Sequence, residues 1–294
     1  MGVLGVGEAH GACSLLHAAG IGYGSSLAID LNTKVAIRDS PPKNKTVDPD
    51  GLLDCIVKTW LEAGYELPAD EIFWAVKSEI PPKQGLKSSS SVAIAALRAL
   101  SNSVNSILES SELVDLASEA HLKAGITLTG SKDDNWAVCE PGWKIVNPNL
   151  PAKEGILLTG QGPSPDEWDI IIVLRGERKK LPKKEDFESH QEAFSKSFDA
   201  LQNGNPIMAM TWNGRAMCGV LSDNSNKRLT NDAIVNGARG SGISGSGNSI
   251  VIFSPSASKP TLNRVIRWYQ SKGLETIVTK PKVIKNEKEN FEGS

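Results

Sequence analysis

Four consecutive serines stand directly before an alanine-rich helical pattern, in the segment from Pro81 to Ser91, which reads PPKQGLKSSSS. The proline pair ends regular structure, and the apolar spacing after the serines predicts a helix that begins within them. The first N–H groups of a helix have no partner inside it, and the helix dipole makes that end positive. The segment therefore predicts an anion site, with phosphate as the commonest ligand. Gly85 would permit a close backbone approach and Lys87 would add a positive charge. The alternative is a plain helix start in which one serine caps the helix and the others are spare.

A second glycine-rich segment, residues 239–247, reads RGSGISGSG and contains a formal G-x-G-x-x-G. That dinucleotide fingerprint should follow a strand and open a helix. Here a helical stretch is expected before it and a strand after it, so the order is reversed. We interpret the segment as a flexible glycine loop beside the phosphates of a ligand, with a long surface turn as the alternative.

A third segment, residues 127–135, reads TLTGSKDDN and is expected to be a polar loop. Its adjacent carboxylates, Asp133 and Asp134, could supply a metal ligand or a base beside a transferring phosphoryl group. A solvated turn is the other interpretation. The two carboxylates repel each other, so a nearby cation such as magnesium or Lys132 would help to keep both ionised.

Several classes of protein are excluded by what the chain lacks. Its 294 residues carry 32 Lys and Arg against 34 Asp and Glu, a net charge of −2, which argues against nucleic acid as the main partner. No apolar run is long enough for a membrane span, and the N-terminal residues have no basic region typical of a signal peptide. We therefore expect a cytoplasmic protein with no membrane partner.

The motifs of several common sites are also missing. The pattern G-x-x-x-x-G-K-[ST] of the P-loop and the H-R-D of protein kinases do not occur. The four cysteines are far apart, which favours reduced, buried thiols over metal or redox pairs. The histidines are scattered as well, and we expect His121 to be structural.

Helical and strand patterns alternate in both halves of the chain, which indicates mixed α and β layers. Glycine and proline cluster between residues 160 and 168, where we place the change of domain. Residues 25–30 and 33–38 are expected to form a hairpin with a turn at Asn32. The further expected helices are 52–61, 88–100, 112–123, 185–201, 208–221, 231–239 and 262–272; the expected strands are 72–76, 156–158, 170–174, 249–253 and 275–278; and residues 285–290 are expected to be a frayed tail.

The three segments, taken in order, resemble the motifs of the GHMP kinases, the superfamily of galactokinase, homoserine kinase and mevalonate kinase. Within it the chain is most similar to the archaeal-type shikimate kinases. Three details carry that likeness: Lys87 in GLKSSS, where other members usually have glycine; the string T-G-x-x-D-D ending at Asp134; and an early G-x-G-x-x-x-x-I-D-L run at 22–31. The chain departs from the pattern at Tyr23, where the resemblance leads us to expect a basic residue.

The resemblance implies an α/β (α+β) fold in two parts. Residues 1–160 would form a half like domain 2 of ribosomal protein S5, and residues 161–294 a ferredoxin-like half, with ATP and acceptor meeting between them. It implies ATP-dependent phosphorylation of shikimate to shikimate 3-phosphate, in the chorismate pathway, with Mg²⁺. Another acceptor, such as homoserine or mevalonate, and a non-catalytic ligand sensor are the alternatives. The oligomeric state is not determined by the sequence, and a homodimer is compatible with it.

The resemblance also assigns roles to residues. Asp134 aligns with the catalytic aspartate, Asp133 lies next to it, and Ser89 would help to hold magnesium. The implied ATP-binding residues are Pro81, Gly85, Leu86, Lys87, Ser88, Ser89 and Ser90. The implied acceptor-side residues are Gly22, Gly24, Asp30, Ser244, Gly245, Ser246 and Gly247, with Arg239, and Arg215 after it, as the candidates for holding the carboxylate of shikimate.

Overall fold

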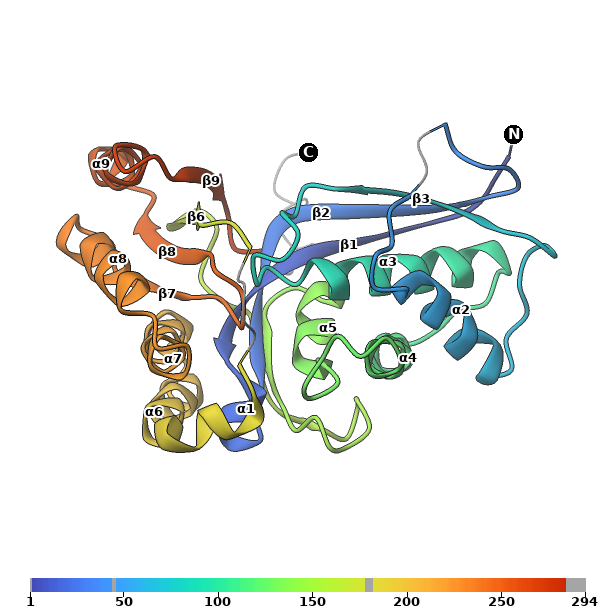
Figure 1. The fold of residues 1–294 in the computed structure, drawn as a ribbon, viewed down its shortest axis with the longest axis horizontal. Helices are drawn as coiled ribbons and strands as arrows, with labels where there is room; N and C mark the ends of the chain where they lie inside the picture. Colours follow the sequence, from blue (N-terminus) through green and yellow to red (C-terminus); the bar gives the residue numbers. More distant parts are fainter. Residues whose placement is uncertain (1, 44–45, 178–181, 284–294) are drawn as a thin grey trace, which may run out of the picture.

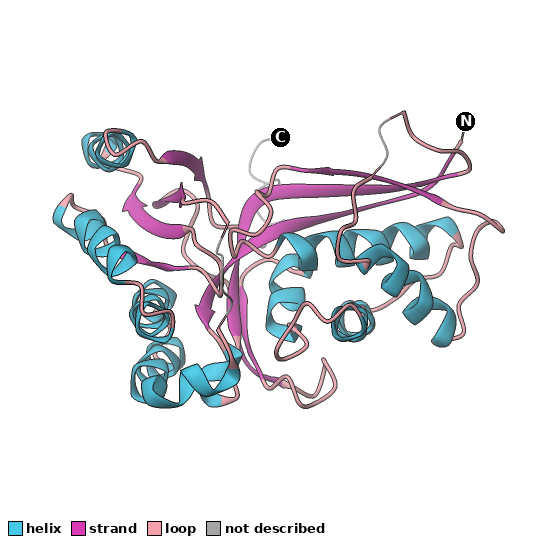
Figure 2. Ribbon diagram, viewed as in Figure 1, coloured by secondary structure: helices cyan, strands magenta, loops and turns pink. Residues whose placement is uncertain are grey.

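The computed structural model describes residues 2–43, 46–177 and 182–283 and arranges them as two antiparallel sheets, each covered by helices on one face (Figures 1 and 2). The first sheet has the order β1-β2-β4-β5, and β3 also pairs with β2. Its strands are β1 (Val3–Leu16), β2 (Ser25–Arg38), β3 (Phe73–Ser78), β4 (Trp143–Val146) and β5 (Ile156–Gly160), and its helices are α2 (Leu52–Glu62), α3 (Ser88–Ser103), α4 (Ser110–Lys123) and α5 (Lys132–Cys139), with the short α1 (Ala18–Ile21) between β1 and β2.

The second sheet has the order β7-β8-β6-β9, and all its pairs are antiparallel. Helices separate β6 from β7 and β8 from β9, which is the β-α-β-β-α-β sequence of ferredoxin-like folds. The strands are β6 (Trp168–Leu174), β7 (Gly240–Ile243), β8 (Ile250–Pro255) and β9 (Glu275–Thr279); the helices are α6 (Gln191–Gln202), α7 (Pro206–Val220), α8 (Asn224–Val235) and α9 (Lys259–Gln270), and a 3-10 helix, Lys184–His190, precedes α6.

One hydrophobic core joins the two sheets. Leu27 and Ile29 of β2 lie in the same buried cluster as Ile170 and Phe253 of the second sheet. Side chains that alternate with these along β6 and β8 face the opposite way and pack with α8 and α9. The division between residues 160 and 161 therefore stays a prediction, since the sheets change there while the core continues.

The expected hairpin at 25–38 is wrong, because these residues form the single long strand β2. The residues pair with β1 throughout, but the register jumps: His10 faces Asn32 whereas the next residue, Gly11, faces Ile29. Two extra residues on β2 form a bulge at this point. The polar Asn32 marks that irregularity rather than a turn.

Half of the expected glycine loop is strand β7, so that prediction is corrected. A Cβ on Gly240 would lie 2.4 Å from the Ile207 side chain, and one on Gly242 would lie 2.5 Å from the carbonyl oxygen of Met210. Both contacts belong to α7, which crosses β7 closely. These glycines serve backbone packing, and the part of the expected loop that remains a loop begins at Ser244.

Other boundaries differ from the patterns as well. The polar loop ends early, because α5 begins at Lys132 and contains both aspartates. Helix α8 begins at Asn224, seven residues before the expected start, because the Asp223 side chain accepts a hydrogen bond from the Asn226 N–H and caps it. Strands β1 and β4 were not expected. The expected frayed tail at 285–290 lies outside the described residues.

Among residues 2–43, 46–177 and 182–283, no helix combines the length and the apolar character needed to cross a membrane.

Close packing of α3 on β1 depends on Gly7. A Cβ there would lie 2.1 Å from the carbonyl oxygen of Ala95 and 2.6 Å from the nitrogen of Ala99, both backbone atoms that cannot move aside. We expect Gly7→Ala to lower the free energy of unfolding by about 1–3 kcal/mol, measured by urea denaturation. Gly11→Ala on the same strand is the matched control. Its Cβ would lie 3.3 Å from side-chain atoms of Ile29 and Ile80, a milder contact that involves no close backbone atom, so an equal loss in both variants would contradict the explanation.

Candidate active site

The N-terminus of α3 is open, because no side chain caps it. The N-cap residue is Lys87, and the Ser91 N–H bonds to the Lys87 carbonyl as the first helical hydrogen bond. Among the described residues, the N–H groups of Ser88, Ser89 and Ser90 have no hydrogen-bond acceptor. The Ser89 side chain is exposed, Ser88 is half-buried and Ser90 is buried. The interpretation as a serine-capped helix start is therefore wrong, and the terminus has what an anion site needs.

A loop from the second half packs directly on this turn. The Ser244 hydroxyl donates to the Gly85 carbonyl at 2.7 Å, and the Ser249 hydroxyl donates to the Gln84 carbonyl at 2.6 Å. A Cβ on Gly85, whose φ is +77°, would lie 2.0 Å from the Ser244 carbonyl oxygen, and one on Gly247 would lie 2.2 Å from the Gly85 nitrogen. The predicted phosphate turn and the predicted glycine loop at 244–247 therefore lie in backbone contact.

Asp134 lies at the centre of this arrangement. Its Oδ1 is 2.9 Å from the Lys87 Nζ and accepts a hydrogen bond of 2.8 Å from the Ser26 hydroxyl. The Lys87 side chain is 10% exposed and that of Asp134 is 18% exposed, so the pair is largely shielded from water. Three elements, the N-terminus of α3, the first turn of α5 and strand β2, thus converge on one carboxylate.

Asp133 has a different environment from its neighbour. Burial raises the pKa of its carboxyl well above the usual range, and the charge of Asp134 raises it further. A Cβ on Gly24 would lie 2.4 Å from the Asp133 Cγ, so this carboxyl is seated against the backbone after the Gly22 turn. A raised pKa favours the neutral form of the Asp133 carboxyl. This lessens the repulsion that two adjacent carboxylates would otherwise have.

His17 connects the end of β1 to the loop at 244–248. Its Nδ1 accepts from the Ala19 N–H at 3.3 Å, so its Nε2 is left to donate to the Ser246 hydroxyl, 3.1 Å away. Its own N–H donates to the Asn213 side chain on α7. Burial lowers the pKa of His17 to about 4, and the nearby Lys87 charge acts in the same direction. The imidazole is therefore neutral at pH 7.

Three predicted acceptor-side residues lie elsewhere. Asp30 is four residues beyond Ser26 on β2, about 13 Å along the strand, and its carboxylate pairs with Lys282. Arg239 is exposed at the start of β7, whereas the 244–248 loop follows the end of that strand. Arg215 is exposed on α7 and lies over the Trp212 ring. The structure does not bring these residues to Asp134.

Two predicted ATP-side residues support the turn. Leu86 is buried, and its carbonyl accepts from the Ala12 N–H at 3.2 Å, which ties the turn to β1. Pro81 is half-buried at the entrance to the turn. The buried Leu86 side chain therefore fixes the backbone of the turn that precedes α3.

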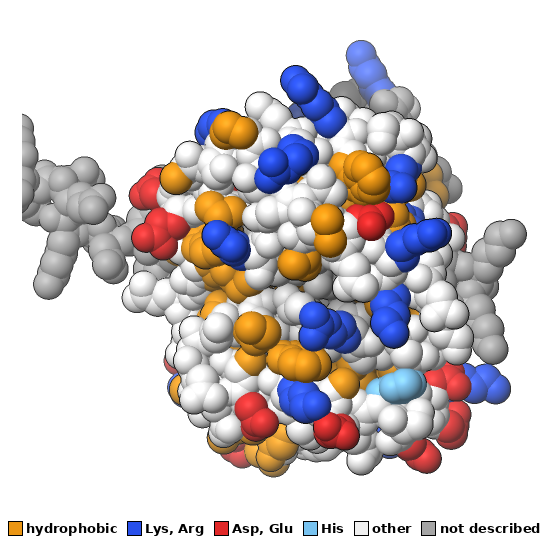
Figure 3. All heavy atoms as spheres, turned by 90° about the vertical axis from the view of Figure 1, so that its left-hand side faces the viewer, with side chains coloured by type: hydrophobic (Ala, Val, Ile, Leu, Met, Phe, Trp, Pro, Cys, Tyr) orange, Lys and Arg blue, Asp and Glu red, His pale blue; other side chains and the backbone are white. Residues whose placement is uncertain are grey.

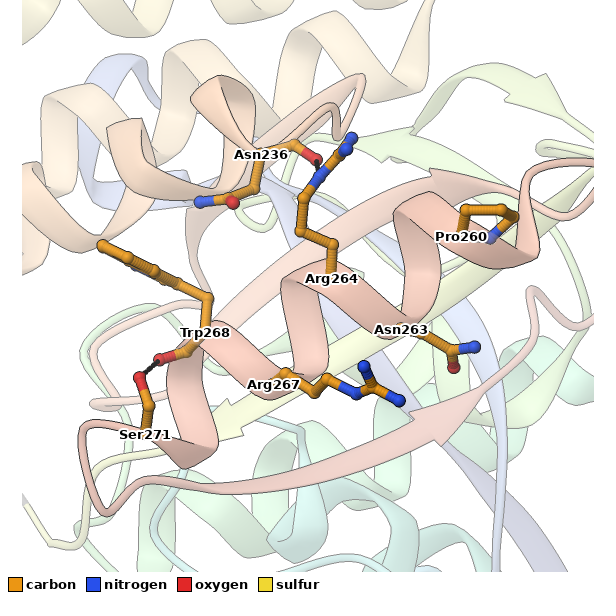
Figure 4. A pocket seen from close by; sticks show the side chains of 7 residues that line it. All are labelled: Asn236, Pro260, Asn263, Arg264, Arg267, Trp268 and Ser271. Atoms are coloured by element: carbon orange, nitrogen blue, oxygen red, sulfur yellow. Dashed lines mark hydrogen bonds between the residues drawn. The ribbon is translucent and has the colours of Figure 1, made fainter.

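A shallow pocket of about 500 Å³ lies far from these motifs, on the outer side of the second sheet. Figure 4 shows that α9 side chains and Asn236 build it, and that the Arg264 side chain donates to the Asn236 carbonyl. Figure 3, which shows the face on the side of α6 to α9, has Lys and Arg side chains dispersed among apolar ones. None of the predicted site residues lines this pocket.

Comparison with known proteins agrees with the geometry. The family described as GHMP kinases N terminal domain matches residues 53–140. The shikimate kinase of Methanobrevibacter smithii is 25% identical over 291 residues, covering 91% of this chain and 94% of that protein, and the shikimate kinase of Methanococcoides burtonii is 25% identical, covering 98% and 97%. The crystal structure of the Methanococcus jannaschii mevalonate kinase is similar in fold, with a TM-score of 0.74 at 16% identity, covering 94% of this chain and 98% of that one.

Residues 53–140 therefore match the GHMP kinase family, and the described residues have its fold of two antiparallel sheets with helices, as the resemblance predicted. The class of activity that these matches support is ATP-dependent phosphoryl transfer to a small molecule.

Four polar residues at the site were missed by the sequence analysis: Ser14, His17, Ser26 and Asn213. Ser26 lies inside a strand pattern, where alternation distinguishes the two faces but not which position reaches a ligand. His17 follows an apolar run and has no neighbouring motif. No local signal identifies these residues, because their partners lie more than 100 positions away in the sequence.

The pKa of His17 predicts a loss of stability in acid. Between pH 6.5 and pH 4 the unfolded chain binds a proton on this imidazole and the folded protein does not, so unfolding becomes easier as the pH falls through this window. At pH 5 the contribution is about 2 kcal/mol. We expect His17→Gln to lose less unfolding free energy than the parent between pH 7 and pH 5, as measured by denaturant titration. If the unfolding free energies of the two proteins had the same pH dependence, the lowered pKa of His17 would be contradicted. As a control, the two plots of unfolding free energy against pH should run parallel between pH 7 and pH 8.

Proposed function

We propose that this kinase transfers the γ-phosphoryl group of ATP to shikimate, forming shikimate 3-phosphate in the chorismate pathway. The observation that carries the proposal is the largely shielded cluster of Lys87, Asp134 and Ser26 at the uncapped start of α3. Relatives of nearly the same length at 25% identity bear the name shikimate kinase, which supports this acceptor over others. A cytoplasmic location, where ATP is abundant, fits the proposal.

The nucleotide side is formed by the turn from Gly85 to Ser90. Three N–H groups without acceptors point out of α3 and would bind phosphate oxygens, with the helix dipole behind them. Magnesium fits here, because the Ser89 hydroxyl is exposed at the same helix end and Mg²⁺ needs few protein ligands besides phosphates and water. When bound, the ion would neutralise charge on the β and γ phosphates.

Asp134 is the better candidate for the catalytic carboxylate. Its Oδ1 pairs with the Lys87 ammonium group, and a carboxylate at this position can accept a proton from an acceptor hydroxyl. Asp133 is buried with a raised pKa and lies against Gly24, so it serves to shape the turn. The acceptor would enter between this turn and Ser246, whose hydroxyl His17 holds.

The acceptor is tested by an ADP-release assay with MgATP and a panel of shikimate, homoserine and mevalonate. We expect turnover with shikimate alone. We expect Asp134→Asn to lower kcat by about 10²-fold or more, because the amide cannot take the proton that the carboxylate accepts in the transition state.

Asp30→Asn is the matched control, since this carboxylate pairs with Lys282 away from the cluster and should leave kcat within about threefold of the parent. Turnover with homoserine or mevalonate instead would reject the acceptor while retaining the kinase. Binding of ATP without turnover on any acceptor would favour a ligand sensor on the same fold.

A further inference from the structure

The position of Lys87 is unfavourable for a lysine for two separate reasons. Its φ of +63° is in the left-handed region, which side chains with a Cβ avoid. It is also the N-cap of α3, where the helix dipole repels a cation. Glycine would be preferred there on both counts. Such a local conflict, maintained in a well-packed part of the fold, is typical of a functional position.

The surroundings of the ammonium group explain what opposes these costs. The Lys87 Nζ lies 2.9 Å from Asp134 Oδ1, and the side chain is almost fully shielded from water. A Cβ on Gly245 would lie 2.9 Å from the same nitrogen, so the absence of a side chain at Gly245 leaves room for it. The Ser14 hydroxyl is the next neighbour of that position. The ammonium therefore lies between the carboxylate and the loop at 244–248.

No other cationic side chain belongs to the segments around this carboxylate. Residues 14–26, 84–91, 133–135 and 244–248 contain Lys87 as their single lysine or arginine. The turn between Gly22 and Gly24 carries Tyr23, whose ring lies 5.4 Å from that of Phe198 on α6. All positive side-chain charge in these segments thus comes from the α3 N-cap.

We propose that Lys87 is a catalytic residue whose ammonium group pairs with Asp134 beside the acceptor and faces the phosphoryl group as it transfers. The inference rests on the proposed kinase function. In the step, the acceptor hydroxyl gives its proton to Asp134 and its oxygen bonds to the γ phosphorus. The bond from that phosphorus to the β,γ-bridging oxygen breaks, and ADP leaves with the electron pair. The Lys87 ammonium group opposes negative charge on the transferring oxygens.

The test replaces Lys87 by Met, which keeps the length and removes the charge, and by Arg, which keeps the charge and changes its shape. We expect Lys87→Met to lower kcat by about 10²-fold or more, with the MgATP dissociation constant within about fivefold of the parent. Lys87→Arg should recover part of kcat.

Lys83→Met is the matched control. Lys83 lies in the same segment and also has a left-handed backbone, with a φ of +58°, but its side chain is exposed and pairs with Glu177. This variant should keep the parental kcat and MgATP dissociation constant. If Lys87→Met folds poorly, Lys87→Gly replaces it, because glycine suits the backbone at this position.

Two results would overturn the proposal: a Lys87→Met enzyme with kcat within about threefold of the parent, or one that loses only MgATP affinity. The second result would mean that Lys87 only binds the phosphates of MgATP in the ground state and does not act in the transition state. Failure of the proposed acceptor is a separate outcome, seen in the parent protein itself. If no acceptor gives turnover, the same comparison is made on slow ATP hydrolysis, in which water is the acceptor.

Discussion

The backbone contact between the turn at 84–85 and the loop at 244–249 is the constraint on which the site depends. Residues about 160 positions apart are joined there by serine hydroxyls that donate to backbone carbonyls, at 2.6 Å to Gln84 and 2.7 Å to Gly85. The Ser14 N–H donates in turn to the Ser244 hydroxyl, so β1 joins the same network. The glycines at the contact let the two backbone segments touch. The uncapped N-terminus of α3 is therefore held at a fixed distance from the loop at 244–249. In the proposed reaction, the phosphate groups and the acceptor would meet beside Asp134.

The electrostatics of the site divide two adjacent carboxyl groups between two tasks. Burial leaves Asp133 with a raised pKa, so it can be seated against Gly24 without an unpaired charge. Asp134 retains a cation and a hydroxyl partner on the same oxygen. A pair of ionised neighbours in this setting would destabilise the fold, and a pair of neutral ones could not accept a proton. The asymmetry follows from the helix α5, which turns consecutive side chains about 100° apart and so into different surroundings.

The sequence predicts the nucleotide half of the site better than the acceptor half. Helix starts, turn glycines and acidic pairs can be recognised from short stretches of sequence. These signals predicted that Lys87, Asp134 and the loop at 244–247 belong to one site, and in the structure they lie close together. Asp30 and Arg239 were included because they lie near motifs in sequence, but a strand carries a side chain away at about 3.3 Å per residue. Strand pairing is likewise a long-range property, which explains why the β2 bulge was interpreted as a turn and why β1 was missed.

Gly240, Gly242 and Lys87 show that a residue's place in a sequence motif does not determine its role in the structure. Gly240 and Gly242 fit a nucleotide fingerprint by spacing, yet their hydrogens are in contact with α7, and their role is to let a helix cross a strand. Lys87 has a left-handed backbone conformation that glycine adopts more readily, and its side chain reaches the largely shielded carboxylate of Asp134. A spacing pattern cannot separate these cases, because it describes order along the chain and not the neighbours in space. The free-energy cost of each residue in its observed conformation does separate them: the glycines relieve a steric conflict, and the lysine creates one that the ion pair with Asp134 must offset.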